Sequence, residues 1–316
     1  MENLIGNTPM IKINYEYLNK KRSIYVKVES YNLTGSIKDR MAYFIIQRAK
    51  EKKLLKEGMP IVEATSGNTG ISLSAIGAYY KHPVYIFMPD WVSSERKKLM
   101  ELFGAKVFLV SKEEGGFKEA IKRSCDYANR INGYRPDQFN NPDNVLAHYK
   151  TTAEEIIKKE IPFDTFTSGI GTGGTLMGIS KRLKEVYKDI KIIALEPDTI
   201  PVLSQNVKNG SHKIEGIGDD FVPSIVSRDI IDDIVLINDE DAINMSKLLS
   251  KELGLGVGIS SGANFLSAVL NNRNNKTLTI FVDDNKKYLT TDLSKPIDTN
   301  PSFVSNKIKL LDYEYI

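Results

Sequence analysis

The chain has 316 residues, of which 41% are hydrophobic and 26% are charged. This length exceeds one compact core of ordinary size, so we expect two domains or one domain with a large insertion. The 43 Lys and Arg against 40 Asp and Glu give a formal net charge of +3, which argues against nucleic acid or an anionic membrane surface as a partner.

Several other classes of protein are disfavoured by the sequence. Cys125 is the only cysteine, so no intramolecular disulfide or cysteine-based metal site is expected. The histidines His82, His148 and His212 show no metal-ligand spacing, and no apolar run reaches the roughly 18 residues of a membrane span. The first residues lack the basic and apolar regions of a secretion signal. We therefore expect a cytoplasmic globular protein without a structural metal.

A rhythm of strand followed by helix runs along the chain. It predicts an α/β fold with two parallel or mostly parallel sheets flanked by helices, the two groups of units being separated by residues 136–164. The expected strands are 60–64, 84–88, 106–110, a segment ending near 168, 192–195, 234–237 and 278–282. The expected helices are 69–80, 94–103, 117–131, 173–186 and one that follows Asn238. In open α/β sheets ligands bind beyond the carboxyl ends of the strands, so the loops there are the candidate site.

The first candidate loop contains Lys38, which precedes the helical pattern of Met41, Phe44 and Ile45. An ammonium at a helix N-terminus is disfavoured by the helix dipole and loses its proton more easily. A lysine that forms a Schiff base needs this property. The alternative is an exposed lysine beside Asp39 and Arg40.

Two further loops join a strand to a helix. Residues 65–70, Thr-Ser-Gly-Asn-Thr-Gly, place hydroxyls, an amide and free backbone N–H groups where a carboxylate or phosphate could bind. Residues 169–175, Gly-Ile-Gly-Thr-Gly-Gly-Thr, contain the G-x-G-x-x-G pattern of dinucleotide sites, and Glu196 ends the next strand. A nicotinamide-dependent oxidoreductase is therefore an alternative, although the extra Gly and Thr suit a terminal phosphate better and Lys38 would have no role.

Taken together and in order, these loops resemble the cysteine synthase family of pyridoxal-phosphate enzymes, which includes O-acetylserine sulfhydrylases and cystathionine β-synthases. The resemblance runs almost from end to end. The matching segments are residues 4–9, 35–40, 65–70, 88–89 with 94–96, 138–142, 171–175, 216–218 and 258–263.

The resemblance implies a fold type II enzyme, like the tryptophan synthase β-subunit, that uses pyridoxal 5'-phosphate. Lys38 would carry the cofactor and remove the substrate α-proton, and Asn68 would bind the pyridine 3-hydroxyl. The residues implied to bind the substrate carboxylate are Thr65, Ser66, Thr69 and Gln138, and those implied to hold the phosphate are Gly171, Thr172, Gly173, Gly174 and Thr175.

The resemblance also implies an arrangement of domains. Residues 1–38 with 149–316 would form a large cofactor-binding domain, and residues 39–148 a small mobile domain that closes over a small amino-acid substrate. The chain would act as a homodimer.

Two departures from the family pattern introduce carboxylates. The usual G-I-G-A-G-F becomes residues 216–221 with Asp219 and Asp220, which are otherwise interpreted as solvated loop charges. In an ungapped match Asp283 falls where relatives place the Ser or Thr that meets the pyridine nitrogen, and Asp284 is the alternative. A carboxylate there would keep that nitrogen protonated and strengthen the electron sink.

These carboxylates suggest water as the nucleophile, because they would repel hydrosulfide but could deprotonate water. The hypothesis is conversion of L-cysteine and water to L-serine and hydrogen sulfide through an α-aminoacrylate. The base would be Asp219, Asp220 or Asp232. We favour Asp232, because adjacent aspartates are not expected both to face the substrate and Asp232 starts a strand beside the site. The alternatives are an O-acetylserine sulfhydrylase, a nicotinamide-dependent oxidoreductase and a non-catalytic binding module.

Overall fold

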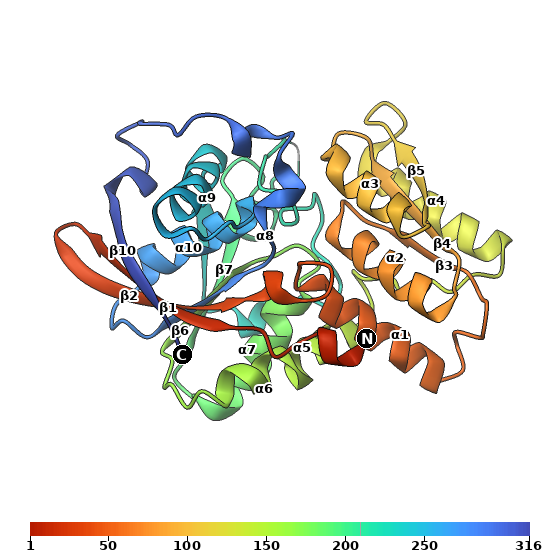
Figure 1. Cartoon of the computed structure of the whole chain (residues 1–316), viewed down its shortest axis with the longest axis horizontal. Helices are drawn as coiled ribbons and strands as arrows, with labels where there is room; N and C mark the ends of the chain where they lie inside the picture. Colours follow the sequence, from red (N-terminus) through yellow and green to blue (C-terminus); the bar gives the residue numbers. More distant parts are fainter. Residues whose placement is uncertain (209) are drawn as a thin grey trace.

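The computed structural model describes residues 1–208 and 210–316. It contains a seven-stranded sheet with the order β10-β1-β2-β9-β6-β7-β8 and a three-stranded sheet with the order β3-β4-β5 (Figure 1). The strands of the larger sheet are β1 (Met10–Tyr17), β2 (Lys20–Val28), β6 (Thr165–Gly169), β7 (Lys191–Pro197), β8 (Asp233–Ile237), β9 (Thr277–Phe281) and β10 (Ile308–Tyr315). Those of the smaller sheet are β3 (Ile61–Ala64), β4 (Val84–Pro89) and β5 (Lys106–Val110).

Ten α-helices surround these sheets in the described part of the chain. They are α1 (Lys38–Glu51), α2 (Asn68–Tyr80), α3 (Ser94–Leu102), α4 (Gly116–Arg130), α5 (Pro142–Lys150), α6 (Thr152–Ile157), α7 (Gly174–Val186), α8 (Val202–Gln205), α9 (Asp239–Leu253) and α10 (Ile259–Asn271). Each segment expected to be a strand or helix is found as one, with ends that move by a residue or two. The predicted α/β fold with helix-flanked sheets is confirmed.

The strands are parallel except at one edge of the larger sheet. There β1 pairs antiparallel with both β2 and β10. These three strands were not predicted, because β10 is mostly exposed and has no apolar run, and its partner β1 lies at the other end of the chain. The register pairs Ile11 with Tyr315, a contact that no local pattern encodes.

The larger sheet is covered by helices on both faces. One core lies between the larger sheet and α9 and α10, around Ile13, Val26 and Phe265. A second lies on the other face, against α6 and α7, around Phe166 and Ile192. This layering holds the larger sheet rigid and leaves the loops at its strand ends to form a site.

The smaller sheet lies within residues 39–148, whereas every strand of the larger sheet lies outside that range. Figure 1 shows the two sheets side by side, with α1 and α5 between them. Helix α5, which packs against both α1 and α7, spans the expected boundary at residue 148. The domain boundaries and the closing motion stay predictions.

Among the described residues, no helix combines the length and the apolar character that crossing a membrane requires.

Candidate active site

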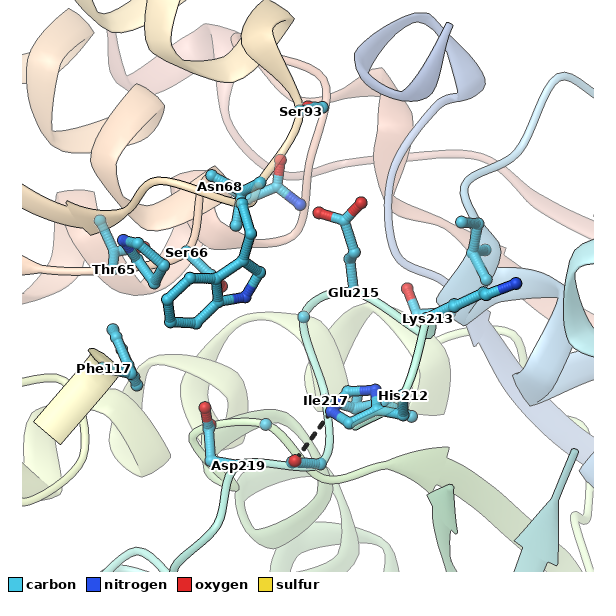
Figure 2. A pocket seen from close by; sticks show the side chains of 18 of the residues that line it. Thr65, Ser66, Asn68, Ser93, Phe117, His212, Lys213, Glu215, Ile217 and Asp219 are labelled. Carbon is cyan, nitrogen blue, oxygen red and sulfur yellow. Dashed lines mark hydrogen bonds between the residues drawn. The ribbon is translucent and has the colours of Figure 1, made fainter. Parts of the chain in front are cut away.

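A cavity of about 760 Å³ lies where the loops of the two sheets meet (Figure 2). In Figure 2, Thr65, Ser66 and Asn68 lie across the cavity from the loop that carries Glu215 and Asp219. Most of the predicted site residues line it. These are Lys38, Thr65, Ser66, Asn68, Thr69, Gln138, Gly171, Thr172, Asp219 and Asp220.

Lys38 is the first residue of α1, and the start of this helix is fastened to the end of β9. The Ile37 amide donates to the Val282 carbonyl at 2.9 Å, and Ser36 forms an isolated β-bridge with Asp283. Burial lowers the pKa of Lys38, while the charges of Asp283 and Asp219 oppose that shift. An amine that is more easily neutral is a better nucleophile and a better proton acceptor.

Asp39 and Arg40 are buried, in contrast to the surface interpretation of this segment. The Asp39 carboxylate accepts hydrogen bonds from the Thr34 backbone and hydroxyl at 2.7 and 2.6 Å. Arg40 pairs with Glu29 and Glu155, each at 2.6 Å. Because Asp39 and Arg40 directly follow Lys38, these contacts fix where the helix begins.

Residues 65–69 and Gln138 form one hydrogen-bonded unit at the start of α2. Thr69 Oγ1 donates to Gln138 Oε1 at 2.7 Å, and Gln138 Nε2 donates to the Ala64 carbonyl at 2.7 Å. Behind them lies Glu63, which accepts the backbone N–H groups of Ala64 and Gln138. Burial raises the pKa of Glu63 to about 7. Sequence reasoning did not single out Glu63, although a lone Glu in an apolar strand was a signal.

The glycines of residues 171–175 form a cradle at the N-terminus of α7. A Cβ on Gly171 would lie 2.2 Å from the Gly216 carbonyl oxygen, and one on Gly174 would lie 1.9 Å from Asn144 Oδ1. The absence of side chains leaves backbone N–H groups open to an anion at the positive end of a helix dipole.

Two side chains that sequence reasoning missed support this cradle. Asn144 donates to Thr172 Oγ1 at 3.0 Å, and His148 Nε2 lies 3.4 Å from Thr175 Oγ1. Burial, with the charges of Lys38 and Arg40, lowers the pKa of His148 to about 3. His148 is therefore neutral at physiological pH.

Asp283 is completely buried beside Asn68. Its Oδ2 accepts hydrogen bonds from Asn68 Nδ2 at 2.8 Å and from the Tyr288 hydroxyl at 2.6 Å. Among the described residues, Asp283 Oδ1 and Asn68 Oδ1 have no hydrogen-bond partner although both are buried. Asp284, the alternative, instead accepts the Lys286 amide at 3.0 Å. The structure thus brings Asp283, rather than Asp284, to Asn68.

The two adjacent aspartates lie at the opposite side of the cavity. Burial and the charge of Asp220 raise the pKa of Asp219 to about 7, and the charge of Lys38 opposes this rise. Asp220 forms an ion pair of 2.7 Å with Lys118 of α4. The interpretation of these residues as solvated loop charges fits Asp220 in part, but it does not fit Asp219, which is half-buried and has a raised pKa.

Asp232 does not lie at the cavity. Its carboxylate accepts the Ile192 amide at 2.8 Å and pairs with Lys184 at 3.0 Å. It precedes β8, whose partner β7 starts at Lys191, so it sits at the amino ends of these strands. The expectation that Asp232 lies beside the site is wrong, because ligands bind at the carboxyl ends of parallel strands.

Glu196, the acidic residue that the dinucleotide pattern would use to bind a ribose, has other partners in the structure. The Glu196 carboxylate accepts the backbone N–H groups of Leu203 and Ser204, the latter at 2.9 Å. Glu196 therefore caps the short helix α8, and the nicotinamide alternative loses its recognition residue.

The residues present fit pyridoxal phosphate. A half-buried lysine with a lowered pKa can carry an aldehyde, and the glycine cradle at α7 suits a terminal phosphate. The unpartnered oxygens of Asn68 and Asp283 suit polar groups on an aromatic ring between them. Fold and site together define a pyridoxal-phosphate-dependent enzyme of fold type II.

Comparison with known proteins agrees. Residues 1–280 match the family described as pyridoxal-phosphate dependent enzyme. Cysteine synthase B of Campylobacter jejuni is 41% identical over 299 residues, which cover 92% of this chain and 96% of that protein. The chain therefore belongs to the cysteine synthase family of pyridoxal-phosphate-dependent enzymes, which perform β-elimination or β-replacement.

Two solved structures of a hydrogen sulfide-producing enzyme are also similar to this chain. The structure of the enzyme from Fusobacterium nucleatum has a TM-score of 0.94 and 48% identity, and it covers 100% of this chain and 98% of that one. A mutant of that enzyme, in which an aspartate is replaced by asparagine, was solved in complex with an α-aminoacrylate intermediate. Its TM-score is 0.96 at 47% identity, with the same coverage.

Proposed function

We propose that this enzyme converts L-cysteine and water to L-serine and hydrogen sulfide. The observation that carries the proposal is the half-buried carboxylate of Asp219, which lines the same cavity as Lys38 and is close enough for each charge to shift the pKa of the other. A carboxylate in this place can accept a proton from water during attack on the substrate β-carbon.

The remaining site residues have the roles that the family implies. The phosphate is held by residues 171–175, the 3-hydroxyl by Asn68 and the pyridine nitrogen by Asp283, while Thr65, Ser66, Thr69 and Gln138 bind the substrate carboxylate. When bound, pyridoxal phosphate supplies an electron sink that stabilises the negative charge left on the α-carbon. Lys38 accepts the α-proton and later returns it.

Asp219 decides what happens at the β-carbon. After the sulfur leaves as hydrosulfide, the oxygen of water forms the new bond and its proton passes to Asp219. Hydrosulfide takes up one proton and departs as hydrogen sulfide, and Asp219 releases the proton it took from water, so atoms and charge balance over the turnover. With a pKa raised to about 7, Asp219 is ionised in part at neutral pH and can both accept and release this proton.

The Fusobacterium enzyme supports this proposal. It is described as hydrogen sulfide-producing, and replacement of one of its aspartates by asparagine accompanies a bound α-aminoacrylate. Loss of a water-activating carboxylate would leave the step after elimination unfinished. Of the three candidate aspartates of this chain, Asp219 lies at the cavity opposite Asn68 and has a raised pKa. Asp220 instead pairs with Lys118, and Asp232 pairs with Lys184 away from the cavity.

The second candidate function is that of an O-acetylserine sulfhydrylase. It is favoured by the 41% identity to cysteine synthase B. In that case hydrosulfide would be the nucleophile, and it would have to approach an ionised Asp219 against charge repulsion.

Incubation of the purified protein with L-cysteine alone separates the candidates. We expect sulfide and L-serine in equal amounts. Pyruvate in place of serine would show elimination without capture of water. Cysteine made from O-acetylserine and sulfide, with no sulfide released from cysteine, would establish the sulfhydrylase instead.

Replacement of a single carboxylate tests the role of Asp219. Asp219→Asn should slow serine formation by about 10²- to 10⁴-fold, the usual contribution of a general base, while sulfide release in the first turnover persists. Asp232→Asn is the matched control and should form serine at a rate close to that of the wild type. A slow Asp232→Asn with a normal Asp219→Asn would contradict the assignment.

A further inference from the structure

Arg96 is a buried cation with no part in the steps above. It is the third residue of α3, and only 2% of it is exposed. A guanidinium is costly to bury unless its N–H groups and charge are paired. Its partners come from three segments that meet at the cavity, so its position depends on all of them.

The first partner is the loop that is proposed to bind the substrate carboxylate. Arg96 Nη1 donates to the Ser66 carbonyl at 3.0 Å. The side chain passes so close to Gly67 that a Cβ there would lie 2.2 Å from Arg96 Cδ. Gly67 is therefore required by the passage of Arg96, which in turn limits how the loop can move.

The second partner is Glu215, which pairs with Arg96 Nη2 from the loop that also carries Asp219. Figure 2 shows the Glu215 carboxylate on the cavity side of this loop, facing the segment with Asn68. The ion pair therefore links α3, which belongs to the region of the smaller sheet, to the loop between α8 and β8 of the larger sheet.

The third partner is the aromatic ring of Tyr288, whose centroid lies 4.7 Å from the guanidinium carbon. A cation over an aromatic face is attracted by the ring quadrupole, so Arg96 fixes the plane of this ring. The Tyr288 hydroxyl donates to Asp283 Oδ2, which also accepts from Asn68. Burial and Asp283 raise the pKa of Tyr288, which keeps the donated proton in place.

Neighbours of Arg96 hold the same helix start without reaching Asp283. Ser93 Oγ donates to the Lys287 carbonyl at 2.6 Å. The Glu95 carboxylate accepts the amide and hydroxyl of Thr290 at 2.8 and 2.7 Å. These contacts seat α3 on the segment that contains Tyr288, and they offer a control for the effect of seating alone.

We propose that Arg96 is a positioning residue that sets the Asp283 carboxylate through Tyr288 and the substrate loop through Ser66. Both groups are then held by the contacts of the Arg96 side chain itself, and not by the seating of α3 alone. The inference rests on the proposed roles of Asp283 and Ser66, and it does not depend on whether water or hydrosulfide is the nucleophile.

The test compares Arg96→Met, Tyr288→Phe and the double variant. The readouts are the visible absorption band of the bound cofactor, the apparent dissociation constant for pyridoxal phosphate added to apoenzyme, and kcat and KM for L-cysteine. Each single variant should shift the band and weaken cofactor affinity by about 10- to 100-fold, the range for residues that orient a ligand indirectly. The double variant should lose no more cofactor affinity than either single variant, because both substitutions interrupt the same contacts from Arg96 through Tyr288 to Asp283.

Glu95→Gln is the matched control, since it loosens the same helix without touching Tyr288 or Ser66. It should raise KM and leave the cofactor band and affinity unchanged. The proposal is overturned if Arg96→Met behaves as Glu95→Gln does, or if the losses of the two single variants multiply in the double variant. Should Arg96→Met fail to fold, an unaltered band in Tyr288→Phe, which keeps the ring beneath the cation, overturns it equally.

The outcome is separable from that of the proposed function. The cofactor band and affinity are measured without any turnover. If no serine forms from cysteine, these readouts still report whether Arg96 and Tyr288 act on Asp283.

Discussion

The two ends of the cavity are built in opposite ways. The cradle of residues 171–175 is one continuous stretch of small residues at the N-terminus of α7, and it offers mainly backbone groups. The acidic end has Glu215, Asp219 and Asp220, two of which pair with cations from the region of the smaller sheet. The cradle therefore depends on local sequence, whereas the charge at the acidic end depends on how α3 and α4 sit.

This difference separates the general chemistry of the enzyme from its particular reaction. A rigid backbone cradle serves any pyridoxal-phosphate enzyme of this fold, because the phosphate is the same. In the proposed reaction the acidic end lies toward the substrate β-carbon, where the nucleophile differs between reactions. Changes to the first should remove activity as a whole, and changes to the second should alter which product forms or at what pH.

The largest effect is expected at Lys38, between the two ends. Lys38→Ala removes both the attachment point and the proposed proton acceptor, and should lower turnover of L-cysteine by at least about 10³-fold. The visible absorption of the cofactor should change with it. Lys50→Ala, an exposed lysine on the same helix, should leave both readings unaltered. Full turnover by Lys38→Ala would contradict the assignment of the site.

The ionisation of Asp219 should determine how the rate of serine formation depends on pH. Asp219 acts as a base only when ionised, and its pKa is raised to about 7. The rate should therefore rise as the pH increases through about 7 and level off above it. Initial rates of serine release, measured across this range, check the prediction. A rate that already levels off near the ordinary pKa of Asp, 3.8, would show that Asp219 is not the base.

The cradle should be sensitive to the addition of a single methyl group. In Gly174→Ala the Cβ would lie 1.9 Å from Asn144 Oδ1, so either the Asn144 side chain or the start of α7 must shift. We expect a loss of about 1–3 kcal/mol in the free energy of unfolding and weaker binding of pyridoxal phosphate. Thermal unfolding and cofactor titration measure the two.

Gly58→Ala provides the control for that substitution. Gly58 has a φ of +69° and no atom within 4 Å of the added Cβ. It should therefore cost about 1–2 kcal/mol through backbone strain alone and leave cofactor binding intact. Equal weakening of cofactor binding in Gly174→Ala and Gly58→Ala would contradict the proposal that residues 171–175 bind the phosphate.

The smallest effect on activity is expected from the exposed ion pair between Lys118 and Asp220. The Lys118–Asp220 pair is exposed, at 62% and 38%, so Lys118→Ala should change the unfolding free energy by less than about 1 kcal/mol. It leaves the charge of Asp220 uncompensated, and this charge raises the pKa of Asp219. The pH midpoint of serine formation should move upward. Lys97→Ala is the control, because Lys97 pairs with Glu101, and it should leave the pH midpoint unchanged. A downward shift of the midpoint in Lys118→Ala would contradict the effect of the Asp220 charge on the pKa of Asp219.

Much of the fold could be predicted from the sequence. Short apolar runs bounded by turns marked β3 to β9, and 3.6-residue periodicity marked the helices that cover them. Strands β1, β2 and β10 were not predicted, because their pairing joins the two ends of the chain. A half-exposed antiparallel edge has a weak local signal, and its stability comes from partners that the sequence does not place nearby.

The site divides in the same way. Lys38 and the two small-residue loops stand out because a turn, a helix start and an anion-binding backbone are properties of consecutive residues. The sequence could not rank Asp219, Asp220 and Asp232, and our choice of Asp232 placed it at the wrong end of its strand. Glu63 and Asn144 were missed, because each acts through a partner far along the chain. Tyr288 was missed because its cation, Arg96, is equally distant in the sequence.

By itself, then, the sequence determined the two-sheet α/β fold, since strand and helix patterns are local. Its resemblance to the cysteine synthase family indicated the cofactor and Lys38 as the proposed residue that carries it. Only the tertiary structure decided which carboxylate enters the cavity and which cation pairs with its neighbours. Burial and charge set the pKa of a group, and both are fixed by segments that meet only after folding.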